Sequence, residues 1–205
     1  MADYFTFALT VFTGFFAIMN PIANTPIFLG LVEGKDELTK RRIAKTSTIT
    51  AFIIVTVFVI LGKYIFEIFG ITIPAFKITG GILIFYVGFE MLMSQKSKVQ
   101  DTENAGDGDG IAISPLAIPI LAGPGTIVTA MNYVSDASIV HVGIVVSTFA
   151  LIAYLTYISF TFSNIILKKF GESLIAVIGK IMGLIIAIIG TGMIIEGIKL
   201  SFSLA

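Results

Sequence analysis

The stretch Asn20-Pro-Ile-Ala-Asn-Thr-Pro26 places two prolines in the middle of a long apolar run. The run covers residues 4–32 and contains no Asp, Glu, Lys or Arg, and a helix needs roughly 20 apolar residues to span a bilayer. A proline has no backbone N–H, and its ring clashes with the carbonyl four residues earlier. Pro26, for example, releases the carbonyl of Ile22. The stretch therefore predicts a membrane-spanning helix that is broken near its middle.

A second stretch, Ile118-Pro-Ile-Leu-Ala-Gly-Pro124, lies in the same way within the apolar run 111–134. Its two prolines have the same spacing as those of the first stretch and lie 98 residues further along the chain. A weaker match pairs Lys77-Ile-Thr-Gly80 with Lys180-Ile-Met-Gly183, 103 residues later. These offsets predict an internal repeat in which each half of the chain begins with a broken span.

The composition of the chain is that of an integral membrane protein. Of its 205 residues, 56% are hydrophobic and 13% are charged, whereas a soluble domain is usually about 25% charged. These values exclude a soluble enzyme and a disordered chain, and the lack of Cys excludes a disulfide scaffold. The 13 basic residues balance 13 acidic ones, so no nucleic-acid partner is expected. Six apolar runs account for almost the whole chain: residues 4–32, 43–69, 75–93, 111–134, 139–167 and 174–198.

We expect an all-α transmembrane fold of six spans, built as two inverted three-helix repeats with proline breaks in spans 1 and 4. Because each repeat contains three spans, the second repeat must insert with the opposite orientation. The first repeat covers residues 1–94, an acidic, Gly-rich cytoplasmic linker covers 95–110, and the second repeat covers 111–205. Inverted repeats of this kind are typical of secondary transporters.

Lys and Arg residues are distributed unevenly between the two sides of this arrangement. Ten of them flank the loops that follow spans 1, 3 and 5, and three lie on the opposite side. Basic loops stay in the cytoplasm. We therefore predict a multi-pass protein of the cytoplasmic (inner) membrane with both termini outside the cytoplasm.

The two broken spans predict a small-molecule site near the middle of the membrane. A break exposes a half-helix N-terminus, whose free N–H groups attract a carboxylate, and unpaired carbonyls, which can hold an ammonium group. An Asn amide can donate to a carboxylate or accept from an ammonium group. Together these groups suit a small zwitterion, that is, an amino acid. A plain proline kink is the alternative interpretation. The candidate substrate-binding residues are Asn20, Pro21, Asn24, Thr25 and Pro26 in the first stretch, and Pro119, Gly123, Pro124, Gly125 and Thr126 in the second.

Charged residues also lie within the apolar runs, among them one pair in each of the runs 75–93 and 174–198. Only twelve uncharged residues separate Lys77 from Glu90, which is roughly 18 Å of helix against a hydrocarbon core of about 30 Å. Ionisable groups at such depth are candidates for function. We expect Lys77 to extend outward to the interface, whereas Glu90 either carries a coupling ion or lies at the cytoplasmic interface. The same argument applies, more weakly, to Lys180 and Glu196.

The sequence contains no pattern that predicts an enzyme or a cofactor site. The linker Asp107-Gly-Asp-Gly110 resembles part of an EF-hand, but the first and twelfth ligand positions would be Ala105 and Leu116, so the calcium loop is incomplete. The motifs H-E-x-x-H and G-x-S-x-G are absent. We therefore expect no catalytic residues, no metal and no cofactor.

Two segments carry a resemblance to a known family: Met19-Asn-Pro-Ile-Ala-Asn-Thr-Pro-Ile-Phe-Leu-Gly-Leu31 and Pro115-Leu-Ala-Ile-Pro-Ile-Leu-Ala-Gly-Pro-Gly-Thr-Ile127. Together with Arg41-Arg-Ile-Ala44 in the first loop, they resemble the MarC family of integral membrane proteins, which includes the SnatA-like small neutral amino acid transporters. The resemblance covers the whole chain and implies uptake of glycine and alanine, coupled to a gradient of protons or sodium ions. Export of another small solute, a membrane-embedded enzyme and a non-transport membrane scaffold are the alternatives, and the oligomeric state stays open.

Overall fold

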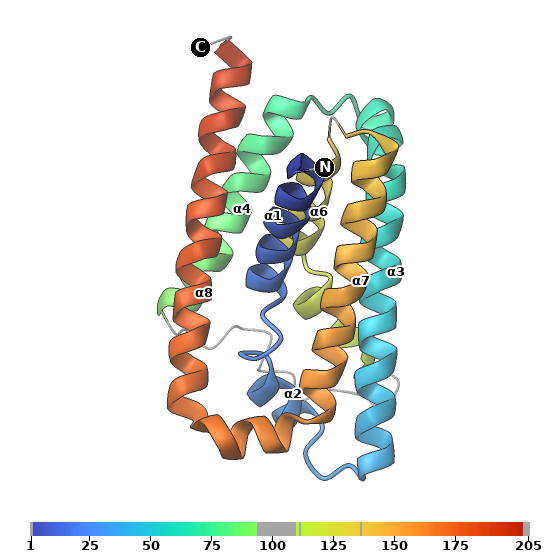
Figure 1. Ribbon diagram of the computed structural model, residues 1–205, viewed down its shortest axis with the longest axis vertical. Helices are drawn as coiled ribbons and strands as arrows, with labels where there is room; N and C mark the ends of the chain where they lie inside the picture. Colours follow the sequence, from blue (N-terminus) through green and yellow to red (C-terminus); the bar gives the residue numbers. More distant parts are fainter. Residues whose placement is uncertain (1, 94–109, 111, 136, 203–205) are drawn as a thin grey trace.

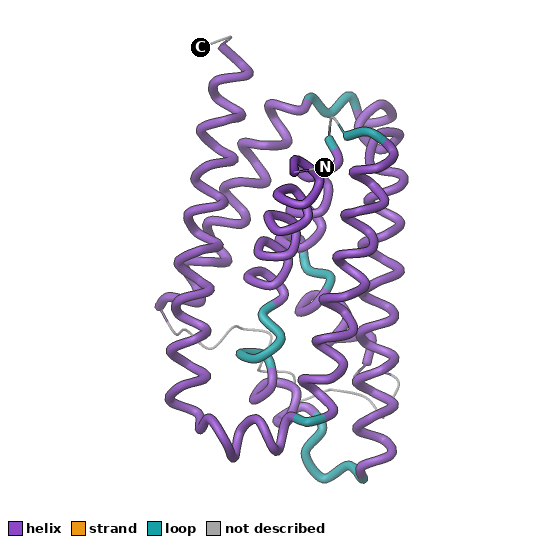
Figure 2. The backbone as a smooth tube through the Cα atoms, in the orientation of Figure 1, coloured by secondary structure: helices purple, strands orange, loops and turns teal. Residues whose placement is uncertain are grey.

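The protein is a bundle of helices that run roughly along one axis (Figures 1 and 2). The computed structural model describes residues 2–93, 110, 112–135 and 137–202, and every regular element in this part of the chain is helical. In chain order, the helices are α1 (Ala2–Met19), α2 (Thr25–Leu31), α3 (Glu37–Phe69), α4 (Ile73–Met93), the π-helix η2 (Ala112–Leu121), α6 (Pro124–Val134), α7 (Ile139–Thr161) and α8 (Ser163–Phe202).

Among the described residues, four helices are long and apolar enough to cross a membrane. They are α3 over Glu37–Gly62, α4 over Ile73–Met93, α7 over Ile139–Thr161 and α8 over Ser163–Phe202. The two proline-rich runs instead form pairs of shorter helices, α1 with α2 and η2 with α6. The prediction of an all-helical, multi-pass membrane protein is confirmed, and both proline-rich runs are interrupted.

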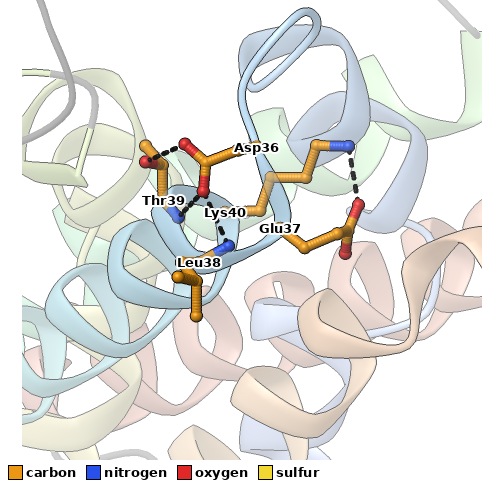
Figure 3. Close-up of polar contacts among 5 residues, drawn as sticks. All are labelled: Asp36, Glu37, Leu38, Thr39 and Lys40. Carbon is orange, nitrogen blue, oxygen red and sulfur yellow. Dashed lines mark hydrogen bonds and ion pairs between the residues drawn. The ribbon is translucent and has the colours of Figure 1, made fainter.

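Local sequence sets both ends of α3. At its start, the Asp36 carboxylate accepts hydrogen bonds from the backbone N–H groups of Leu38 (2.9 Å) and Thr39 (3.0 Å) and from the Thr39 hydroxyl (2.7 Å) (Figure 3). These bonds, chiefly those from Thr39, stabilise the charged carboxylate and lower the pKa of Asp36 below its usual value. At the other end, Gly70 adopts a left-handed φ of 62° that stops the helix.

Glycines allow the backbones of α4 and α8 to touch. Gly81 and Gly88 of α4 meet Gly190 and Gly183 of α8, and in each helix the two glycines are seven residues apart. A Cβ atom on Gly190 would lie 2.4 Å from the backbone nitrogen of Phe85, closer than real Cβ contacts. Small residues permit this close approach between membrane helices, where lipid removes the hydrophobic drive for association. The seven-residue spacing of these glycines is present in the sequence, but the contact between α4 and α8 was not predicted from it.

The main hydrophobic core lies around α1 and α7. Phe15 and Phe149 are buried with their ring centroids 4.8 Å apart, and Phe28 of α2 stacks on Phe160 of α7 at 4.5 Å. Leu116 of η2 belongs to the same cluster. The short helices α1, α2 and η2 therefore have fixed positions against long, continuous helices.

Helix α8 is interrupted at Gly171, where φ is 73° and ψ is 158°. Gly171 lies between the predicted runs 139–167 and 174–198, and the longer part of α8 that follows the kink corresponds to the second of these runs. Of the predicted linker 95–110, only Gly110 lies within the described residues. The division of the chain into two repeats at this linker stays a prediction.

Candidate helix-break site and adjoining cavity

The first proline-rich stretch forms a break between α1 and α2. α1 ends at Met19, and Asn20 adopts a positive φ of 39°, which Asn tolerates better than most residues. The Asn24 amide nitrogen donates to the Met19 carbonyl (2.8 Å), and the Ala23 N–H donates to the Asn20 side-chain oxygen (3.4 Å). The two asparagines thus hold the break in a defined turn.

The Ile22 carbonyl, which the sequence predicts to be free, has partners in the structure. It accepts hydrogen bonds from the Thr25 N–H (3.1 Å) and from the Thr25 hydroxyl (2.7 Å). Pro26 lies in the first turn of α2, where a missing N–H is harmless because the first helical N–H groups have no intrahelical acceptor. The expectation that Pro26 leaves this carbonyl open to a ligand is therefore wrong.

The Asn20 side-chain nitrogen has no hydrogen-bond partner among the residues that the structure describes. It is buried, and Asn20 as a whole is 2% exposed. A buried donor without an acceptor is costly, so this group is poised to donate to a bound molecule. Around it, Pro21 and Thr25 are buried, and Asn24 and Pro26 are half-buried.

The second proline-rich stretch is interrupted between η2 and α6. The Ala122 N–H donates to the Ala117 carbonyl five residues earlier (2.8 Å), which continues the wide π-type turn of η2. Gly123 then caps α6, and Pro124 opens it, with no side-chain hydrogen bond to the first turn. The uncapped N–H groups give this N-terminus a partial positive charge. Of the other predicted residues here, Gly125 and Thr126 are buried, and the side chain of Pro119 lies outside the described part of the chain.

The two breaks lie close together, because α1 packs beside α6 (Figure 1). A Cβ atom on Gly125 would lie 3.1 Å from the Ile18 side chain and 3.7 Å from that of Val87 in α4. On α8, a Cβ atom on Gly179 would lie 3.4 Å from the Ala23 side chain. The first turn of α6 therefore contacts the last turn of α1. Direct contact between the asparagines of the first break and the glycines of the second stays a prediction.

A cavity of about 390 Å³ lies between α1, α6 and α8. On α6 its lining begins at Thr129, about one to two helical turns after Gly123. The cavity therefore lies between the helix breaks and the end of the bundle at which α1 begins. The Tyr133 hydroxyl donates to the Thr10 carbonyl (3.3 Å), and the buried Asn132 side-chain oxygen has no partner among the described residues. The polar residues that line the cavity are Thr10, Thr13, Thr129, Asn132, Tyr133 and Glu196.

Lys77 and Glu196 form an ion pair beside this cavity. The Lys77 Nζ donates to Glu196 Oε1, and the side chains are 8% and 53% exposed, respectively. The Lys77 side chain therefore does not extend outward as expected, because α8 supplies a counter-ion that stabilises the buried ammonium within the protein. Glu196 is thereby held at the cavity wall. The position of the pair relative to the membrane interface stays a prediction.

Glu90 lies on a different part of α4, one turn after Tyr86, and the two side chains interact. Tyr86 is 57% exposed, so this face of α4 points away from the core. Lys180 of α8 is also exposed. A role of Glu90 in ion coupling stays a prediction.

The cavity was not predicted, although the sequence contains a signal for it. Thr10 and Thr13 are three residues apart, and Asn132 and Tyr133 follow Thr129 by three and four residues. This spacing places each set on one helix face. Both sets lie in the runs that carry the proline breaks, and a polar face within a broken span indicates a face that is not exposed to lipid.

Comparison with known proteins shows that almost the whole chain is similar to a family of integral membrane proteins. A family model described as MarC family integral membrane protein matches residues 5–202. A UPF0056 membrane protein of Bacillus subtilis (strain 168) is 38% identical over 201 residues, covering 95% of each chain. Another, from Pyrococcus horikoshii, is 40% identical over 196 residues, covering 96% of each chain. No solved structure matches the chain.

Proposed function

Because the chain belongs to the MarC family of integral membrane proteins, we propose that it is a secondary transporter of small neutral amino acids, chiefly glycine and alanine, in the cytoplasmic membrane. The observation that carries this proposal is the pair of neighbouring helix breaks. One break holds a buried amide nitrogen with no partner among the described residues, and the other holds a helix N-terminus without a side-chain cap. Irregular backbone at membrane depth is tolerated only where it is buried in protein or lines a water-filled cavity. Transporters use such breaks to bind substrate.

An inverted repeat of six spans accounts for the contacts between helices. The first repeat would consist of α1 with α2, α3 and α4, and the second of η2 with α6, α7 and α8. Each span then contacts its counterpart in the other repeat: span 1 contacts span 4 through α1 and α6, α3 contacts α7, and α4 contacts α8. A two-fold axis through the bundle predicts these three contacts. The start of α1 and the end of α8 also lie toward the same end of the bundle, as six crossings require (Figure 1).

The chemistry of the breaks suits a small zwitterion. The N-terminus of α6 and the Asn20 amide nitrogen offer hydrogen-bond donors to a carboxylate. The Asn24 amide oxygen would accept a hydrogen bond from the ammonium group. Ile18 and Val87 lie close to Gly125 and limit the space for a side chain. The proposed site therefore favours glycine and alanine over leucine and phenylalanine.

Transport against a concentration gradient requires a coupling ion, and we propose Glu90 as its carrier, with a proton or sodium as the ion. Glu90 is the only acidic residue of α4, and carboxylates within apolar spans are candidates for such a role. Glu90→Gln should abolish gradient-driven accumulation while exchange of internal for external substrate persists. Normal accumulation by the variant would assign Glu90 to the membrane interface.

Uptake by the purified protein in liposomes tests the proposed function. Labelled glycine and alanine should enter when a proton or a sodium gradient is imposed, and only one of the two gradients should drive accumulation. Unlabelled alanine should compete, whereas leucine and phenylalanine should compete weakly. Correctly inserted protein that moves neither amino acid under either gradient would refute the proposal.

A further inference from the structure

We infer that the cavity between α1, α6 and α8 is a second substrate position, in which the ammonium group of an amino acid binds to Glu196 and Asn132. The inference rests on the transport function proposed above and extends it, because the cavity would hold the amino acid on its way to or from the helix breaks. The cavity volume of about 390 Å³ lies within the range of about 300–1,000 Å³ typical of small-molecule sites.

The hydrogen-bonding groups of the cavity are mostly acceptors. The hydroxyls of Thr10 and Thr13 donate to carbonyls of their own helix at 3.0 Å, and the Tyr133 hydroxyl donates to the Thr10 carbonyl. Their protons are used, but their oxygen lone pairs remain. The Asn132 side-chain oxygen is buried without a partner among the described residues. The Glu196 carboxylate accepts one bond from Lys77 and has lone pairs left for further donors. These acceptors are complementary to an ammonium group, which only donates hydrogen bonds.

The electrostatics of the cavity favour a zwitterion over a metal cation. Its α6 residues lie in the last two turns of the helix, which ends at Val134, and the C-terminal end of a helix dipole attracts positive charge. The negative charge of Glu196 is already balanced by Lys77. A metal ion would add a net charge to this site, whereas an amino acid adds none.

The cavity and the break site are too far apart for one small amino acid to occupy both. Thr126 in the first turn of α6 and Asn132 in the cavity are six residues apart, which is roughly 9 Å along a helix. The ammonium and carboxylate groups of glycine are separated by a single carbon atom. The two sites are therefore distinct positions at successive depths along α1 and α6.

A purely structural role of the Lys77–Glu196 pair is the competing explanation, and a double variant separates the two. Glu196→Gln alone would leave a buried ammonium without a counter-ion, and such a protein can fail to fold. Lys77→Met combined with Glu196→Gln removes both charges at similar side-chain volume, so this protein should fold and insert normally. If the pair serves the fold alone, the double variant keeps its substrate binding.

Protection of a single cysteine from labelling tests the inference directly, because the chain contains no cysteine of its own. Gly192 lines the cavity, and a Cβ atom there meets nothing within 4 Å. In Gly192→Cys protein, glycine, alanine and methylamine should slow labelling by aminoethyl methanethiosulfonate several-fold, whereas propionate, which lacks an ammonium group, should not. Gly143→Cys on α7 is the matched control, because its Cβ atom also meets open space but lies outside the cavity lining.

The double variant, placed in the Gly192→Cys protein, should lose this protection. Persistence of protection without Lys77 and Glu196, or lack of protection by alanine in their presence, would overturn the inference. Alanine transport without protection would overturn the cavity site and not the transport function. Protection without transport would support binding in the cavity and overturn the transport function.

Discussion

Asn20 combines two features that both cost free energy, a positive φ of 39° and a buried amide nitrogen without a partner among the described residues. Strain and unsatisfied polar groups persist at functional sites, where they prepare a residue for its ligand. Asn24, four residues later, has the opposite character, because its amide bonds the Met19 carbonyl and closes the turn. Variants at these two positions should therefore have different effects.

Asn20→Gly should weaken substrate binding without weakening the fold. Loss of the amide donor should lower affinity about tenfold, which corresponds to about 1.4 kcal/mol. Thermal stability should change little, because glycine adopts a positive φ without strain and the unpartnered amide is removed, which offsets the loss of the long 3.4 Å bond from the Ala23 N–H. The concentration dependence of uptake and thermal unfolding in detergent measure the two effects. Unchanged affinity in the inserted variant would remove Asn20 from the site.

Asn24→Ala should weaken both the fold and substrate binding. The variant loses the 2.8 Å hydrogen bond to the Met19 carbonyl, which should cost about 1 kcal/mol of stability, and the loosened break should bind substrate less tightly. Thr191→Ala is the control, because it removes a 2.9 Å bond to the Ala187 carbonyl on α8, away from the breaks. Equal uptake by the two variants would contradict a role of Asn24 in the site.

Among the helices, the proline spacing predicts where breaks occur and not how they are built. Prolines at 21, 26, 119 and 124 mark both interruptions, because a missing N–H and a ring clash disrupt a helix whatever surrounds it. The bonds that repair the breaks depend on the turn that forms. The Thr25 hydroxyl reaches the Ile22 carbonyl, and η2 widens into a π-helix. Neither detail follows from residue spacing.

The α4–α8 contact should fail when a methyl group is placed between the two backbones. A Cβ atom on Gly190 would lie 2.4 Å from the Phe85 nitrogen. Gly190→Ala should therefore lower the free energy of unfolding by about 1–3 kcal/mol or more, as overpacking does in other proteins. Gly192→Ala, two residues along the same helix, should be tolerated because nothing lies within 4 Å of its Cβ position. Thermal unfolding in detergent measures both. Equal stability of the two variants would refute the packing.

For the molecule as a whole, residue patterns predict the class of fold better than the contacts between distant segments. Long apolar runs predict an all-helical membrane protein, because a helix needs an apolar run of this length to cross the bilayer and satisfies its own backbone hydrogen bonds there. Lys77 and Glu196 are 119 residues apart and each resembles an isolated charge near a span end. Only the packing of α4 against α8 brings them together, which is why Lys77 was expected at the interface.

The proposed topology predicts that both termini lie outside the cytoplasm. A cysteine placed at Ala2 or at Ala205 should react with an impermeant thiol reagent in intact cells, because the Lys- and Arg-rich loops lie on the opposite side. A cysteine at the exposed Glu33 in the first loop should be protected until the cells are opened. Labelling of Glu33→Cys together with protection of both termini would reverse the orientation.

Counterflow of alanine tests the central claim, that this protein is a transporter of small neutral amino acids, without any assumption about the coupling ion. Liposomes that contain the purified protein are loaded with unlabelled alanine and diluted into a trace of labelled alanine. Exchange through the protein should produce a transient accumulation of label that protein-free liposomes do not show, and leucine-loaded liposomes should show little. A correctly inserted protein that produces no accumulation with either alanine or glycine would contradict the account.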